Sequence, residues 1–169
     1  MEVDERINLT EYDPLWPTYF EVEKQAILES LNHTIKAVEH FGSTAVPGMV
    51  AKPIIDVLVG IDVVPIGRPL IAALEDLGYE YLAEAGIPGR FYFCKRREVA
   101  FNIAVVEWNG RLWQDNLLLR DFLRSHAEYA HRYIDLKRSA IKSGIVKLLD
   151  YSAYKNQFIT EMLQVARKL

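Results

Sequence analysis

Residues 40–59 read HFGSTAVPGMVAKPIIDVLV, and this stretch decides the fold. It predicts a strand that ends at Phe41, a glycine-serine turn, a loop, and a second strand over residues 54–61. The second strand is β-branched and apolar at nearly every position, which is typical of a central strand covered on both faces. Asp56 is the exception, because a carboxylate in such a strand is costly to bury unless it is paired, hydrogen-bonded or bound to a metal.

The segments on either side of this stretch alternate between helical and strand patterns. Apolar residues recur at steps of three and four from Leu15 to Leu31, which predicts a helix capped by Asp13. The other predicted elements are a strand over 35–41, a helix over 69–77, strands over 79–83, 91–95 and 99–106, and three helices from residue 112 onward. This order predicts an α+β fold with a mixed or antiparallel sheet, an N-terminal helix and a C-terminal helical segment, in one domain over residues 1–169.

Length and composition limit the class of protein. The chain has 169 residues, of which 50% are hydrophobic and 25% charged, as in a soluble globular domain. The single cysteine, Cys94, excludes an internal disulfide, and the first residues lack the features of a signal peptide. The apolar run over residues 54–61 is far shorter than the roughly 18 residues of a membrane span. We therefore expect a cytoplasmic protein with no membrane partner.

The charge is divided unevenly along the chain. The formal net charge of −3 argues against a nucleic-acid surface. Residues 1–84 carry 5 Lys and Arg against 15 Asp and Glu, whereas residues 85–169 carry 15 against 8. Two such halves either attract each other within one domain or form the acidic and basic sides of a binding cleft.

The glycine-serine turn has the chemistry of an anion site. Gly42 lets the backbone approach a ligand closely, and Ser43 offers a hydroxyl and an N–H to a phosphate. Lys52 adds positive charge nearby. The alternative is that these residues only shape a tight connection. Asp56 has two interpretations as well, since it is either a metal or ligand contact or a carboxylate satisfied by backbone N–H groups or an arginine.

Two further side chains are candidates for the same site. His40 adjoins the turn and could act as an acid or base, although a histidine bonded within the loop is the alternative. Arg90 follows the turn over residues 86–89, which places it near the end of a strand, and its guanidinium geometry suits phosphate.

A set of motifs along nearly the whole chain resembles the GrpB family. The motifs are YDPLWP at 12–17, EHFGSTAVPG at 39–48, AKPIID at 51–56, LGY at 77–79, GIPGR at 86–90, RDFL at 120–123 and LKR at 136–138. Members of this family look like divergent relatives of nucleotidyltransferases. The resemblance implies a nucleotidyltransferase-like sheet in which Gly42 and Ser43 seat a nucleotide and Asp56 holds Mg²⁺. The implied reaction is metal-assisted transfer of a nucleotidyl group to an acceptor.

The sequence departs from the nucleotidyltransferase pattern at the metal site. That pattern has a second carboxylate two residues after the first, because residues i and i+2 share one face of a strand. Leu58 occupies this position here. In the strand that supplies the third acid in that superfamily, Asn102 and Ala104 stand at the positions where many GrpB-like sequences carry histidines.

The remaining carboxylates define the functional alternatives. Asp56 with Glu107, or with Glu39, is the pair expected to hold one Mg²⁺. In the first alternative, the protein binds a nucleotide or another phosphorylated small molecule and carries out Mg²⁺-dependent nucleotidyl transfer. In the second, it is a catalytically inactive ligand-binding or protein-interaction module that retains the fold.

Overall fold

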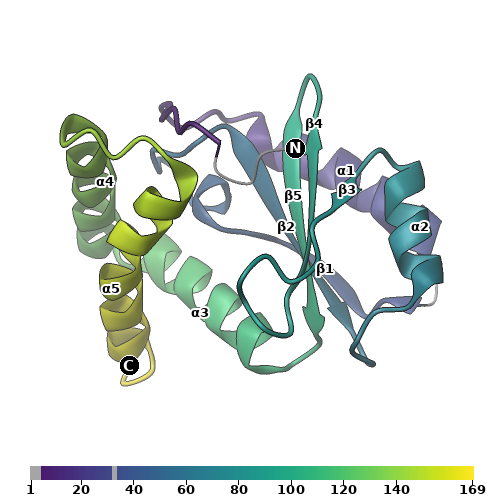
Figure 1. The fold of residues 1–169 in the computed structure, drawn as a ribbon. Helices are drawn as coiled ribbons and strands as arrows, with labels where there is room; N and C mark the ends of the chain where they lie inside the picture. The colour runs from purple at the N-terminus through teal and green to yellow at the C-terminus, as the bar shows by residue number, and fades with distance from the viewer. Residues whose placement is uncertain (1–4, 32–33) are drawn as a thin grey trace.

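The computed structural model describes residues 5–31 and 34–169. Residues 1–4, which carry most of the expectation about a signal peptide, lie outside the described residues, as do 32–33. The described chain forms a five-stranded sheet and five α-helices (Figure 1). The strands are β1 (Ala37–Phe41), β2 (Ile54–Ile61), β3 (Glu80–Tyr81), β4 (Phe91–Arg96) and β5 (Ala100–Glu107). The helices are α1 (Trp16–Leu31), α2 (Arg68–Asp76), α3 (Arg111–Ser125), α4 (Ala127–Lys142) and α5 (Leu148–Ala166), with a short 3₁₀ helix, η2 (Ser43–Ala45).

The sheet is mixed, which confirms the predicted α+β class. Its order is β1-β2-β5-β4-β3, in which β2 and β5 run parallel and the other neighbours are antiparallel. The strand predicted over residues 54–61 has those bounds in the structure. Its side chains alternate between the two faces, so Asp56 and Leu58 lie on the face opposite Ile55 and Val57.

Each face of the sheet is covered by helices, which explains why β2 is apolar on both sides. Helices α1 and α2 pack on one face, where Phe20 and Leu74 join a core with Ile55 and Val57. Helix α3 covers the other face, where Trp113 packs on Leu58 and Ala104 (Figure 1).

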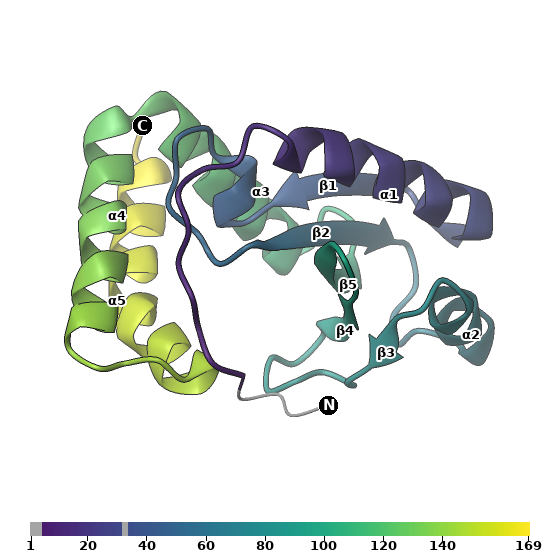
Figure 2. The ribbon, with the colours of Figure 1, turned by 90° about the horizontal axis from the view of Figure 1, so that it is seen from above.

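Helices α4 and α5 lie beyond the end of the sheet, beside α3 and the loop that follows η2 (Figure 2). Tyr133 of α4 and Met162 of α5 share a buried cluster with Val46 and Met49 of that loop. The N-terminal segment contacts the loop between α4 and α5, where the amide of Ile7 donates to the carbonyl of Val146 over 2.7 Å. This arrangement leaves the glycine-serine turn between the sheet and the C-terminal helices.

Some predicted boundaries are wrong. The strand predicted over 79–83 is confined to Glu80–Tyr81. Backbone hydrogen bonds between Leu82 and Tyr92 and between Tyr92 and Ala83 continue the contact with β4, but the φ of 51° at Ala83 interrupts the regular strand geometry. Leu15 was predicted to belong to the first helix, but it precedes α1 and is 50% exposed. Asp13 Oδ1 accepts a hydrogen bond from the amide of Leu15 over 2.9 Å. No helix in the described part of the chain is long and apolar enough to cross a membrane.

Candidate functional site

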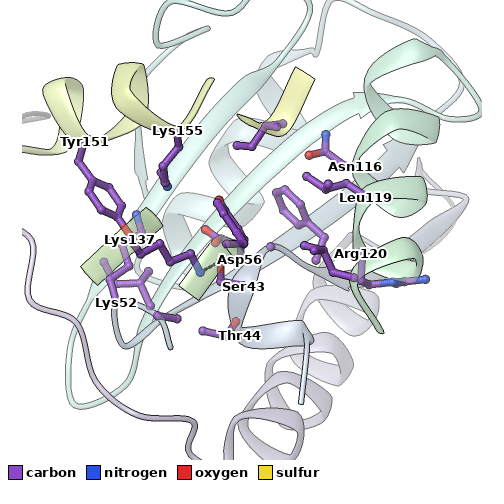
Figure 3. Close-up of a pocket in the computed structure, with 17 residues that line it drawn as sticks. Ser43, Thr44, Lys52, Asp56, Asn116, Leu119, Arg120, Lys137, Tyr151 and Lys155 are labelled. Carbon is purple, nitrogen blue, oxygen red and sulfur yellow. Dashed lines mark hydrogen bonds between the residues drawn. The ribbon is translucent and has the colours of Figure 1, made fainter. Parts of the chain in front are cut away.

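A cavity of about 160 Å³ opens where β1 ends and β2 begins (Figure 3). The N-terminal half lines it with Phe41, Gly42, Ser43, Thr44, Ala51, Lys52, Ile54 and Asp56. The C-terminal half lines it with Asn116, Leu119, Arg120, Leu123, Tyr133, Lys137, Tyr151, Lys155 and Ile159. Residues from both halves of the chain therefore line this cavity. The N-terminal half contributes one carboxylate, Asp56, together with Lys52, so the cavity does not have the acidic side that the cleft alternative requires.

Gly42 allows the turn to pass directly against Asp56. Its backbone has φ 70° and ψ −167°, a combination that residues with a side chain rarely adopt. A Cβ atom at this position would lie 2.6 Å from Asp56 Oδ2. The next residue, Ser43, starts η2 and lines the cavity. The glycine therefore brings the serine and the carboxylate to one wall of the cavity.

Asp56 is held by a chain of polar side chains across the sheet. Its Oδ1 accepts a hydrogen bond from Asn102 Nδ2 over 2.8 Å, and Asn102 Oδ1 accepts one from Arg96 Nη2 over 2.9 Å. Arg96 in turn pairs with Glu5, with 2.7 Å between Nη2 and Oε1. The structure thus gives the half-buried Asp56 a side-chain amide as its partner, instead of the arginine or backbone N–H groups considered from the sequence.

Lys137 reaches the turn from α4 and is only 1% exposed. Its Nζ donates to Ser43 Oγ over 2.6 Å and to the carbonyl of Val50 over 2.8 Å. The same nitrogen lies 4.2 Å from the centre of the Tyr133 ring. Burial, and to a lesser extent the charge of Lys155, lower the pKa of Lys137 well below its usual value.

Lys155 approaches the cavity from α5 and lies over the Tyr151 ring, 4.2 Å from its centre. Burial and the charge of Lys52 lower the pKa of Lys155 to about 8, whereas the charge of Asp56 acts in the opposite direction. No carboxylate among residues 5–31 and 34–169 forms an ion pair with Lys137 or Lys155. The cavity therefore contains cations without a matching number of anions.

His40 lies beside the cavity, next to Arg120 in its lining. His40 Nε2 is 2.9 Å from Thr44 Oγ1, and its ring stacks on Phe20 with 4.8 Å between centroids. Burial lowers the pKa of His40 to about 4. Arg120 Nη1 donates to Glu39 Oε2 over 2.8 Å and to the carbonyl of His40 over 3.0 Å. His40 is thus bonded within the turn, and Glu39 is paired with Arg120.

Besides His40 and Glu39, two more predicted site residues, Glu107 and Arg90, are absent from the cavity lining. Glu107 faces Ile61 in the sheet register, five positions along from the pair of Asp56 and Asn102. At about 3.3 Å per residue, this separates Glu107 from Asp56 by roughly 17 Å of strand. Arg90 is absent from the cavity lining: its Nη2 donates to the carbonyl of Ala85 over 2.9 Å, and its guanidinium lies over the Tyr92 ring of β4. Burial lowers the pKa of Arg90, whereas the charges of Tyr92 and Asp56 act in the opposite direction.

Comparison with protein families gives a match over residues 6–165 to the model described as GrpB protein. The chain belongs to the GrpB family. A UPF0157 protein of Pseudomonas aeruginosa is 33% identical over 95% of this chain and 67% of its own length. The glutamate-rich protein GrpB of Alkalihalophilus pseudofirmus is 29% identical over 88% of both chains.

A solved GrpB structure shares the fold. The crystal structure of the conserved protein GrpB from Enterococcus faecalis superposes with a TM-score of 0.85 at 32% identity, covering 95% of this chain and 98% of that one. The architecture described above is therefore that of a GrpB protein.

The cavity of this GrpB-family chain does not fit Mg²⁺. Leu58, at the position of the second carboxylate, is fully buried under α3 with Ala104 and Trp113. In the part of the chain that the structure describes, no three His, Cys, Asp or Glu side chains gather as a metal site. Among the described residues that line the cavity, Asp56 is the one carboxylate, and the positive charges of Lys52 and Lys155 repel a divalent cation.

The sequence interpretation missed the two helical lysines. Lys137 comes four residues after Tyr133 and three before Ala140, so it occupies the buried stripe of α4. Lys155 comes four residues after the buried Tyr151. A lysine within an apolar helical stripe could have indicated these two site residues from the sequence, because a buried cation needs a specific partner or a ligand.

Proposed function

We propose that the cavity binds the phosphate groups of a nucleotide or another phosphorylated small molecule without a divalent metal. The observation that carries this proposal is the convergence of Lys52, Lys155 and the Ser43 hydroxyl on one cavity, in whose described lining Asp56 is the single carboxylate. Cationic amines and a hydroxyl are donors that phosphate oxygens accept, and such charge-assisted hydrogen bonds are stronger than neutral ones.

The size of the cavity supports phosphate groups as the enclosed part of the ligand. Its volume of about 160 Å³ is close to the roughly 150 Å³ of an engineered cavity that binds benzene. A space of that size admits one or two phosphate groups but not a complete nucleotide. The rest of such a ligand would extend from the mouth of the cavity.

Asp56 has a role in this proposal that requires no metal. Its negative charge raises the pKa of Lys155, and so opposes the loss of that proton caused by burial. The hydrogen bond from Asn102 fixes the carboxylate in that position. Nucleotidyl transfer assisted by Mg²⁺ is not part of the proposed function, because the donor set does not fit that ion.

Isothermal titration calorimetry with pyrophosphate, supplied as its non-hydrolysable methylene analogue, in EDTA and in Mg²⁺, tests the proposal. We expect binding in EDTA, and Lys155→Gln should weaken it by about 10-fold to 100-fold, since a hydrogen bond to a charged group contributes roughly 1.5–3 kcal/mol. Lys142→Gln, on the exposed surface of α4, is the matched control and should leave the affinity unchanged. Binding that needs Mg²⁺ and disappears in Asp56→Asn would contradict the proposal.

A further inference from the structure

The contact between Ser43 and Lys137 joins two parts of the chain that are 94 residues apart. Lys137 Nζ lies 2.6 Å from Ser43 Oγ, and the carbonyl of Val50 holds the same nitrogen over 2.8 Å. Figure 3 shows Lys137 pointing toward Ser43 at the wall of the cavity. A lysine used only to attract an anion would need neither the burial nor this second anchor.

The surroundings of Lys137 favour an amine over an ammonium. The residue is 1% exposed, and none of the described carboxylates forms an ion pair with it. Removing an unpaired charge from water costs several kcal/mol, which a buried lysine avoids by releasing its proton. The lowered pKa of Lys137 has this cause. An uncharged amine within hydrogen-bond distance of a hydroxyl can accept its proton.

Ser43 is placed where a nucleophile would meet a bound ligand. It follows β1 through Gly42, whose positive φ of 70° turns the chain sharply, and its side chain lines the cavity. Lys155 and Lys52 line the same cavity and supply positive charge for a phosphoryl group. Pairs of serine and lysine act as nucleophile and general base on several unrelated folds.

We propose that Ser43 is a nucleophile toward phosphate anhydrides, with Lys137 as its general base. The proposal rests on the proposed function for the position of the phosphate groups. Ser43 Oγ forms a bond to phosphorus while its proton passes to Lys137 Nζ. The bond from phosphorus to the leaving phosphate oxygen breaks, and Lys137 returns the proton to that oxygen. Water then attacks the phosphoserine and gives a proton to Lys137, which passes it to the released Ser43 Oγ.

Labelling with a fluorophosphonate, followed by peptide mass spectrometry, tests this chemistry without requiring a known substrate. We expect an adduct on Ser43 of the native protein. Lys137→Arg should reduce the labelling rate by about 100-fold or more, because arginine keeps a donor but does not accept a proton at neutral pH, and general bases contribute roughly 10²–10⁴-fold. Ser139→Ala, on the exposed surface of α4, is the matched serine control and should label like the native protein.

The outcomes separate the two proposals. A native protein that binds pyrophosphate but gives no Ser43 adduct overturns the nucleophile and leaves the binding site standing. A protein that labels at Ser43 but binds no pyrophosphate overturns the proposed function instead. Equal labelling of the native protein and Lys137→Arg removes Lys137 as the base. If circular dichroism shows that Lys137→Arg is unfolded, Lys137→Met supplies the same comparison, with loss of the adduct expected.

Discussion

Replacing Gly42 with alanine should destabilise the protein by about 3–4 kcal/mol. One part of this loss of stability comes from the backbone, because φ 70° and ψ −167° lie in a region nearly restricted to glycine. A residue with a side chain in that region lowers the free energy of unfolding by roughly 1–3 kcal/mol. The steric part follows from the added Cβ, which would lie 2.6 Å from Asp56 Oδ2 and 3.2 Å from Asp56 Cβ. Overpacking of this kind costs roughly 1–3 kcal/mol.

Urea unfolding followed by tryptophan fluorescence measures this cost, with Gly48→Ala as the matched control. Gly48 also has a positive φ, 77°, but no described atom outside its neighbours lies within 4 Å of its added Cβ. We therefore expect only the backbone cost of about 1–2 kcal/mol there. In an Asp56→Ala background, the cost of Gly42→Ala should fall by about 1 kcal/mol or more, while that of Gly48→Ala stays constant. Equal costs for both glycines, or a cost of Gly42→Ala that does not depend on Asp56, would contradict a steric conflict between the two residues.

Two predictions concern pH. Because His40 has a pKa of about 4 in the folded protein and about 6.5 unfolded, its contribution should lower the free energy of unfolding by about 3 kcal/mol as the pH falls from 7 to below 4. His40→Gln should flatten this part of the urea-derived profile and the exposed His131→Gln should not; identical profiles would contradict the prediction. Because Lys155 is cationic below its pKa of about 8, sulfate affinity measured by calorimetry should fall about tenfold from pH 7 to pH 9. Lys155→Arg should abolish the fall, and an unchanged fall in that variant would assign it to another group.

The central strand was predictable because its residue types indicate burial on both faces. Residues 54–61 are apolar on both faces, and α1 and α3 cover those faces in the structure. The parallel pairing of β2 with β5 was not predictable, because a strand pattern specifies burial but not the neighbour along the sheet. The end of β3 depended on the positive φ of Ala83, which residue type did not indicate.

Half of the site was predictable from local sequence. Gly42, Ser43, Lys52 and Asp56 lie within 15 residues of one another, and the structure places all four on the cavity. Lys137 reaches the same cavity through the packing of α4, which local sequence does not describe. Conversely, Glu107 and Arg90 were predicted from their chemical type. The strand register places Glu107 at the far end of β5, and Arg90 donates to the carbonyl of Ala85 outside the cavity lining.

A crystal structure of the protein with the non-hydrolysable methylene analogue of pyrophosphate, grown in EDTA, would show whether the cavity binds phosphate groups without a metal. We expect the phosphonate groups within hydrogen-bond distance of Ser43 Oγ and Lys155 Nζ, with Asp56 still bonded to Asn102. Phosphate bound outside the cavity, or bound only when a divalent metal on Asp56 accompanies it, would contradict the account.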